Sequence, residues 1–275
     1  MPAHSNAHDE LDPISREFYR RVMRRLNDEQ VPYLVGGAYA LGRYTGIQRD
    51  TKDFDIFVRR TDYDRVMELL ESGCGCSTEL TFPHWLGKAI CGDRYVDVIF
   101  SSGNGVATVD EEWFDHSLAG VVLGEPVRLN PAEEMIWSKA FIQERERFDG
   151  ADVAHIFKAR ADQMDWPRLL ARFGQNWRVL YSHLVLFGYI YPDSRMLVPS
   201  WVMTELNTRL IAETTTAVPA DRICNGPVLS RQQYLPDLEE GYEDARVEPV
   251  GTMTEEQVAA WTDAIKVDGD GTQNN

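Results

Sequence analysis

The chain has 275 residues, a formal net charge of −16 and a hydrophobic content of 43%. These values indicate a globular protein of one or two domains with a sizeable core. No stretch approaches the roughly 20 apolar residues of a membrane span, and the start of the chain lacks the apolar segment of a secretory signal. The acidic balance argues against a general nucleic-acid binder, because such binding relies on basic residues that neutralise phosphates. The four cysteines form no dense framework, so a reducing cytoplasm is expected.

The first half of the chain predicts alternating helices and strands. Residues 11–30 carry apolar side chains at spacings of three and four, which is typical of a helix. A short buried strand at 33–35 ends at Gly36-Gly37, and a helical segment follows at 38–44. The further predictions are a strand at 54–59, a helix at 62–71 capped by Thr61 and stopped by Gly73, and hairpins around Gly92-Asp93 and Gly124-Glu125.

The second half predicts helices. Asn130-Pro131 with Glu133 is typical of a helix start, with Asn130 as the N-cap. The predicted helices are 131–147, 150–163, 166–173, 175–190 and 199–213. From Pro236 to Asn275, eleven acidic residues face only Arg246 and Lys266, which indicates a partly solvated tail.

Together these elements predict an α/β (α+β) protein. A small mixed β-sheet with flanking helices precedes a helical bundle and an acidic tail. The predicted domains are residues 1–129, 130–215 and 216–275, the last being an acidic, partly extended segment.

The residues that carry chemistry lie in the first half. Gly36-Gly37 lies between a strand and a helix N-terminus, where backbone N–H groups can approach a phosphate closely. Asp53 and Asp55 alternate along a predicted strand and therefore share one face of it. Asp97 lies within an apolar run on another strand. Three such carboxylates predict a divalent-metal site beside a phosphate.

Mg²⁺ prefers hard oxygen ligands, and two such ions about 3.5–4 Å apart stabilise the charge that develops in nucleotidyl transfer. Asp53 and Asp55 would bridge the two ions. Asp97 would hold the ion at the acceptor hydroxyl and take its proton. The alternative is a solvated strand face with Asp97 at a hairpin end, but burying three carboxylates among apolar neighbours without a metal would be costly.

The segments that contain these residues resemble the DNA polymerase β-type nucleotidyltransferase superfamily. They are Val35-Gly36-Gly37, Arg49-Asp50-Thr51-Lys52-Asp53-Phe54-Asp55 and Val96-Asp97-Val98. The version around Asp53 is similar to a bacterial branch that includes antibiotic-modifying and toxin–antitoxin nucleotidyltransferases. Further segments, at 133–139, 145–153, 233–235 and 241–246, resemble an uncharacterised bacterial group.

The resemblance implies a mixed sheet that carries the site, Mg²⁺ dependence and an NTP donor, with ATP as the expected nucleotide. It implies triphosphate contacts for Gly36 and Gly37 and metal ligation for Asp53, Asp55 and Asp97. Superfamily members often place a cation on the first bundle helix, which would be Lys139.

Other polar residues have weaker support. Arg49 and Lys52 precede Asp53 and could clamp the phosphates, since Arg binds phosphate in a bidentate manner. The alternative for both, and for Lys139, is an ordinary surface charge. Asp149 and Asp152 are expected to cap the next helix, where a carboxylate is favourable.

A zinc site of Cys74, Cys76, Cys91 and His84 would match no established spacing, so these cysteines are expected to act as small buried hydrophobes. Helical spacing predicts that five aromatic residues of the helical half lie in the core, namely Trp137, Trp166, Trp177, Phe173 and Phe187. Stacking of one of them on a nucleotide base is the less favoured interpretation.

Three functions fit these residues. The favoured one is transfer of NMP from an NTP to a hydroxyl of a small-molecule acceptor, because an acidic surface attracts cationic acceptors. The second is toxin-type transfer to tRNA or protein. The third, a non-catalytic nucleotide-binding module, is disfavoured because all three carboxylates are present.

Overall fold

The computed structural model describes residues 11–49, 51, 53–246 and 256. The chain divides into two compact units. The first unit comprises residues 1–39, 48–130 and 246–275, and the second comprises residues 40–47 and 131–245. Among the helices of the described residues, none is both long enough and apolar enough to cross a membrane.

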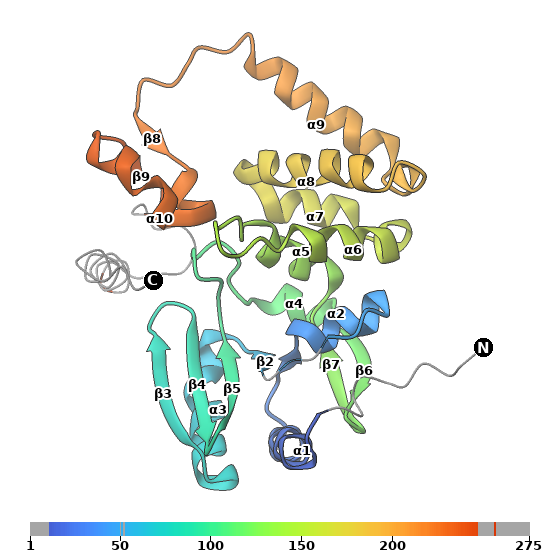
Figure 1. The fold of residues 1–275 in the computed structure, drawn as a ribbon, viewed down its shortest axis with the longest axis vertical. Coiled ribbons are helices and arrows are strands. Elements are labelled where there is room, and N and C mark those ends of the chain that lie inside the picture. The colour runs from blue at the N-terminus through green and yellow to red at the C-terminus, as the bar shows by residue number, and fades with distance from the viewer. Residues whose placement is uncertain (1–10, 50, 52, 247–255, 257–275) are drawn as a thin grey trace. The chain divides into compact units, whose positions relative to one another are not determined.

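The first unit is built on a seven-stranded mixed sheet with the strand order β3-β4-β5-β2-β1-β7-β6. Its strands run from blue to green in Figure 1. They are β1 (Leu34–Val35), β2 (Phe54–Phe57), β3 (Ser77–Phe82), β4 (Leu86–Cys91), β5 (Arg94–Ile99), β6 (Leu118–Val122) and β7 (Glu125–Leu129). Strands β2 and β5 are parallel, as are β1 and β7, whereas the other pairs are antiparallel.

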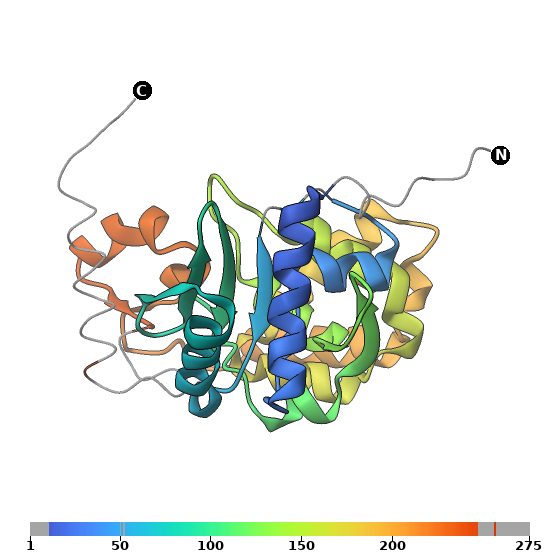
Figure 2. The same ribbon diagram turned by 90° about the horizontal axis from the view of Figure 1, so that it is seen from below.

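Helices α1 (Pro13–Asp28) and α3 (Arg60–Cys74) contact each other and the strands of this sheet (Figure 2). The strands turn alternate apolar residues into this layer, so Phe54 and Ile56 are fully buried. The ring of Tyr19 on α1 stacks on that of Phe54, with ring centroids 4.9 Å apart. Because Phe54 and Ile56 face this core, Asp55 between them faces the opposite side of the sheet.

Two short helices belong wholly or in part to the first unit. Helix α2 (Gly37–Thr45) begins directly after β1, and α4 (Glu111–Asp115) precedes β6. Residues Gly37 to Tyr39 belong to the first unit, whereas the rest of α2 belongs to the second.

The second unit is mainly helical. Its helices are α5 (Ala132–Ala140), α6 (Gly150–Arg160), α7 (Trp166–Phe173), α8 (Trp177–Ile190), α9 (Ser200–Glu213) and α10 (Gly226–Glu239), and a small parallel pair joins β8 (Ile223–Cys224) to β9 (Glu243–Asp244). Phe157, Phe173 and Phe187 are almost completely buried, and the Phe157 ring stacks on Trp166. Trp166, Phe173 and Phe187 therefore lie in the core, as their spacing predicts.

Helix α3 differs from its predicted form at both ends. It begins at Arg60 without a side-chain cap, so Thr61 is not the N-cap, and it runs through Gly73 to end at Gly75 with φ +67°. A Cβ at Gly73 would lie 2.4 Å from Arg25 Nε. Gly73 therefore leaves room for the Arg25 side chain of α1 and does not end the helix.

The predicted start and length of the first bundle helix were also wrong. Pro131 is the N-cap residue of α5, because the backbone N–H of Asn130 bonds to Val35 O at 3.0 Å and extends the β1–β7 pairing. The helix ends at Ala140, and the residues up to 149 form a loop with a bridge between Gln143 and Phe148.

Two further differences concern elements that the sequence did not predict. Strand β3 is an edge strand whose residues are mostly exposed, so it has little apolar alternation. The segment expected to be partly extended contains α10 and the β8–β9 pair. The acidic end predicted as a tail lies largely outside the described residues.

Candidate functional site

The sheet places Asp55 and Asp97 side by side. Strands β2 and β5 pair in parallel with Asp55 opposite Asp97. On the other side of β5, Lys88 of β4 lies opposite Asp97. Residues opposite each other on adjacent strands share one face, with backbones about 4.8 Å apart. Lys88, Asp97 and Asp55 therefore form one row across three strands.

Asp53 lies two residues before Asp55, at the entrance to β2. The Thr51 hydroxyl lies 3.1 Å from both the backbone N and the backbone O of Asp53, which fixes the loop there. The Tyr95 hydroxyl donates a hydrogen bond to Asp53 Oδ1. Because Tyr95 and Asp97 alternate along β5, this bond places the Asp53 carboxylate on the same face as the row.

The electrostatics of Asp97 follow from this crowding. Burial raises the pKa of its carboxyl group, and the negative charge of Asp53 raises it further. Lys88 opposes both effects, because its Nζ lies 2.6 Å from Asp97 Oδ1. The carboxylates thus repel one another in a half-buried place, which favours a bound cation.

The glycine pair closes the site at the end of β1. The Gly36 N–H donates to the backbone oxygen of Asp55 at 3.0 Å. A Cβ at Gly36 would lie 2.3 Å from the ring of Phe57 and 2.7 Å from Asn130 Nδ2. Gly37 has φ +53°, and a Cβ there would lie 1.8 Å from Asp55 Oδ2. Both positions therefore require glycine, and the N-terminus of α2 lies directly against Asp55.

The positions and oxygen donors of Asp53, Asp55 and Asp97 fit Mg²⁺, which binds hard oxygen ligands. Their present side-chain contacts direct Asp97 toward Lys88 and Asp53 toward Tyr95. Accordingly, no three His, Cys, Asp or Glu side chains of the described residues are gathered as a metal site. A metal at these carboxylates would replace those contacts.

The other residues that the sequence predicts to bind phosphate are Arg49, Lys52 and Lys139, and they do not belong to the carboxylate row. Arg49 is exposed in the loop between α2 and β2, and Lys52 lies outside the described residues. Lys139 of α5 belongs to the second unit. The roles of Arg49, Lys52 and Lys139 toward a triphosphate stay predictions.

Lys139 forms a largely buried ion cluster within the second unit. Its Nζ lies 2.7 Å from Asp149 Oδ2 and 2.9 Å from Asp152 Oδ2. Burial would raise the pKa of Asp149, but hydrogen bonds from Arg147 and the Lys139 charge outweigh it, so the pKa is lowered. Asp149 is the N-cap residue of α6 but makes no side-chain cap bond. The predicted capping role was therefore wrong for its side chain.

The four cysteines are free, and Cys74 on α3 and Cys76 just before β3 pack as buried hydrophobes. Burial lowers the pKa of His84 to about 4, and its Nε2 lies 3.2 Å from the carbonyl oxygen of Gly103. Within the described part of the chain, no three of these side chains are gathered as a metal site.

Sequence reasoning did not single out Lys88 or Tyr95, although a signal existed. The hairpin predicted around Gly92-Asp93 pairs Cys91 with Arg94, and counting outward from that pair places Lys88 opposite Asp97. Tyr95 is two residues from Asp97 and so on its face.

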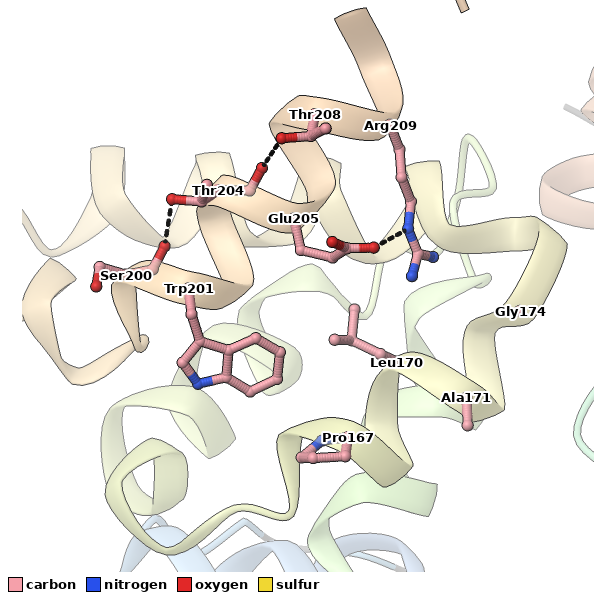
Figure 3. A pocket seen from close by; sticks show the side chains of 10 residues that line it. All are labelled: Pro167, Leu170, Ala171, Gly174, Ser200, Trp201, Thr204, Glu205, Thr208 and Arg209. Atoms are coloured by element: carbon pink, nitrogen blue, oxygen red, sulfur yellow. Dashed lines mark hydrogen bonds and ion pairs between the residues drawn. The ribbon is translucent and has the colours of Figure 1, made fainter. Parts of the chain in front are cut away.

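A surface pocket of about 960 Å³ lies elsewhere, between α7 and α9 of the second unit (Figure 3). Pro167, Leu170 and Trp201 give it apolar walls. Its charged groups satisfy each other, because Arg209 Nε lies 2.8 Å from Glu205 Oε1. The Thr204 and Thr208 hydroxyls donate to backbone oxygens of α9. These contacts leave its polar lining engaged within the helix, so the carboxylate row is the stronger candidate site.

Comparison with known proteins gave matches among solved structures only. No protein-family model matches the chain, and no curated protein does. The solution structure of the antibiotic-resistance factor ANT(2'')-Ia is 18% identical, with a TM-score of 0.46, and the match covers 63% of this chain and 98% of that one. The crystal structure of the lincosamide antibiotic adenylyltransferase LnuA, with lincomycin bound, is 14% identical, with a TM-score of 0.37, and covers 51% and 94%.

A nucleotidyltransferase-like protein from Paracoccidioides brasiliensis is 16% identical, with a TM-score of 0.36, over 62% of this chain and 91% of that one. Values of this size assign neither a substrate nor catalytic residues to this chain. These three structures are described as an antibiotic-resistance factor, a lincosamide antibiotic adenylyltransferase and a nucleotidyltransferase-like protein.

Proposed function

We propose that the chain is a Mg²⁺-dependent nucleotidyltransferase that moves NMP from an NTP, with ATP as the expected donor, to a hydroxyl of a small-molecule acceptor. The observation that carries this proposal is the register that sets Asp55 beside Asp97, with Asp53 two residues away, against the glycine turn at the start of α2. We assign the chemistry to the unit that contains the sheet.

In this proposal each residue has a distinct task. Asp53 and Asp55 would hold Mg²⁺, and Asp97 would accept the proton of the acceptor hydroxyl. Bound Mg²⁺ would supply charge stabilisation at the attacking and leaving oxygens. Gly36 and Gly37 give the phosphates access to backbone N–H groups, because no side chain projects there.

The acceptor class follows from charge. The net charge of −16 favours a cationic small molecule over a polynucleotide, whose phosphates would be repelled. Transfer to tRNA or protein is the alternative that the experiment must separate.

The test offers the full-length protein Mg²⁺ and each α-labelled NTP, together with aminoglycosides and other hydroxylated antibiotics, total tRNA, or the protein alone. We expect label in a small molecule. Asp97→Asn should lower turnover roughly 100-fold or more while Mg·NTP affinity stays within about threefold, because it acts on the acceptor side. Asp55→Asn should lower both the turnover and the affinity for Mg·NTP.

Asp93→Asn is the matched control, because Asp93 is an exposed carboxylate in the turn of the same hairpin. It should leave turnover and affinity unchanged. Label in tRNA or protein would overturn the small-molecule acceptor. Failure of transfer to every acceptor, with unaltered Mg·NTP affinity in Asp55→Asn, would favour a non-catalytic module.

A further inference from the structure

Lys88 is held in a defined place next to the carboxylates. Strand β4 pairs with β5 over six residues, and this register fixes Lys88 opposite Asp97. Its Nζ lies 2.6 Å from Asp97 Oδ1 and 4.1 Å from the centroid of the Tyr95 ring. Its side chain is 24% exposed, so the ammonium group is partly withdrawn from water.

The ion-pair partner of Lys88 is Asp97, although a second carboxylate lies opposite Lys88 on the neighbouring strand. Glu79 of β3 lies opposite Lys88 on its other side, and Glu79 is exposed. The Lys88 ammonium nevertheless pairs with the more buried Asp97. Tyr95, which lies under this ammonium, donates its hydroxyl to Asp53. Lys88 and Tyr95 thus engage two of the three carboxylates, one by charge and one by hydrogen bond.

We propose that Lys88 is the resident counter-ion of the carboxylate row and that a divalent cation must displace it from Asp97. This inference rests on the proposed function, because it requires that Asp53, Asp55 and Asp97 bind metal. A metal ion binds a carboxylate oxygen at about 2.0–2.1 Å, and an ammonium held on the same group would repel it. Lys88 is therefore a positioning residue that sets how tightly the site binds metal.

The proposal predicts that a substitution of Lys88 changes the affinity for metal in an unusual direction. Removing Lys88 leaves Asp97 half-buried beside Asp53 without its cation, which increases the attraction for a divalent ion. Lys88→Met should therefore strengthen metal binding, whereas loss of a residue that assists binding would weaken it. Lys88→Arg keeps the charge and should keep the competition.

The experiment measures Mn²⁺ binding to the full-length protein without nucleotide, by electron paramagnetic resonance of the free ion. We expect Lys88→Met to lower the Kd for Mn²⁺ about fivefold or more, and Lys88→Arg to stay within about twofold of the parent. Asp55→Asn should raise the Kd roughly tenfold, because it removes a ligand. Circular dichroism confirms that each variant is folded.

Arg65→Met is the charge-matched control. Arg65 is exposed on α3, and its guanidinium donates to Glu29 O at 3.2 Å. Arg65→Met removes the same unit of positive charge as Lys88→Met but leaves the carboxylate row unchanged. An equal gain in Mn²⁺ affinity in Lys88→Met and Arg65→Met would show that the effect comes from net charge alone, which would overturn the inference.

The remaining outcomes separate the two proposals. If Asp55→Asn weakens Mn²⁺ binding but Lys88→Met leaves it unchanged or weaker, the inference about Lys88 is wrong and the proposed metal site stands. If Mn²⁺ binding is absent or insensitive to Asp55, both are overturned.

Discussion

Gly37 shows how one missing side chain shapes the site. The glycine pair in the sequence predicts a phosphate site, because glycine lets a phosphate come close to the backbone. The structure adds a second reason, because the Asp55 carboxylate occupies the space that a Cβ at Gly37 would need. Gly37 thus determines the position of a carboxylate as well as access to the backbone.

Gly37→Ala should therefore impair metal and nucleotide binding more than its backbone strain explains. Gly75→Ala is the matched control, because Gly75 has φ +67° with nothing within 4 Å of the added Cβ. Each substitution places alanine in a left-handed conformation, at a cost of about 1–2 kcal/mol. Only Gly37→Ala also displaces Asp55. Compared with Gly75→Ala, it should therefore lose more free energy of unfolding in urea denaturation and show a higher Kd in Mn²⁺ titration. Equal effects of the two would contradict this role.

At this scale the sequence predicted which face of the sheet the carboxylates share, but not the side chains that they contact. Asp53, Asp55 and Asp97 follow from strand alternation, which is a local property. The Asp149 side chain was mispredicted because the cap rule considers only neighbouring residues, whereas Lys139 reaches Asp149 through the packing of α5 on α6.

Among the elements, α5 and α7 are joined by buried charges. The Glu134 side chain is fully buried, and its Oε1 accepts hydrogen bonds from Arg168 Nη1 and from Arg172 Nε, the latter at 3.1 Å. Arg168 also pairs with Glu133 at 2.8 Å. Two helices adjacent in space but not in sequence are therefore linked through one carboxylate.

Glu134→Gln should destabilise the protein by roughly 3–5 kcal/mol, because it removes the fully buried negative charge that Arg168 and Arg172 both contact. Glu213→Gln removes one partner of the exposed pair with Arg178 and should cost about 0–1 kcal/mol. Urea denaturation of both variants measures the difference. A loss at Glu134 no larger than that at Glu213 would show that the cluster contributes little.

The elements that the sequence predicted well are those with strong local signals. Both hairpins form around their predicted turns, because Gly92 and Gly124 take the positive φ that each turn requires. Strand β3 gives no such signal, since an exposed edge strand needs no apolar alternation. Gly73 was misinterpreted because its use depends on Arg25 of another helix.

For the molecule as a whole, the division into units follows packing more than chain order. Residues 40–47 belong to the second unit, although the chain on both sides of them belongs to the first. A linear division at residue 129 does not reveal this exchange, because it follows chain order alone. The net charge, in contrast, is readable directly from the sequence.

That charge predicts a salt dependence for the proposed reaction. For a polycationic acceptor, kcat/KM should fall several-fold between about 20 and 200 mM salt, because screening weakens attraction by the net charge of −16. A neutral acceptor measured in the same buffers is the control and should show little change. If the two acceptors respond alike, electrostatic attraction does not select the acceptor.

The parallel pairing of β2 with β5 has a consequence for the order in which the molecule assembles. Lys88 and Asp97 lie on one hairpin and meet as soon as that hairpin closes, whereas Asp55 joins Asp97 only after the intervening α3, β3 and β4 have been placed. Closing such a long loop is slower than zipping a hairpin. During refolding we therefore expect Lys88 to contact Asp97 before Asp55 does, so that the proposed metal site is completed last.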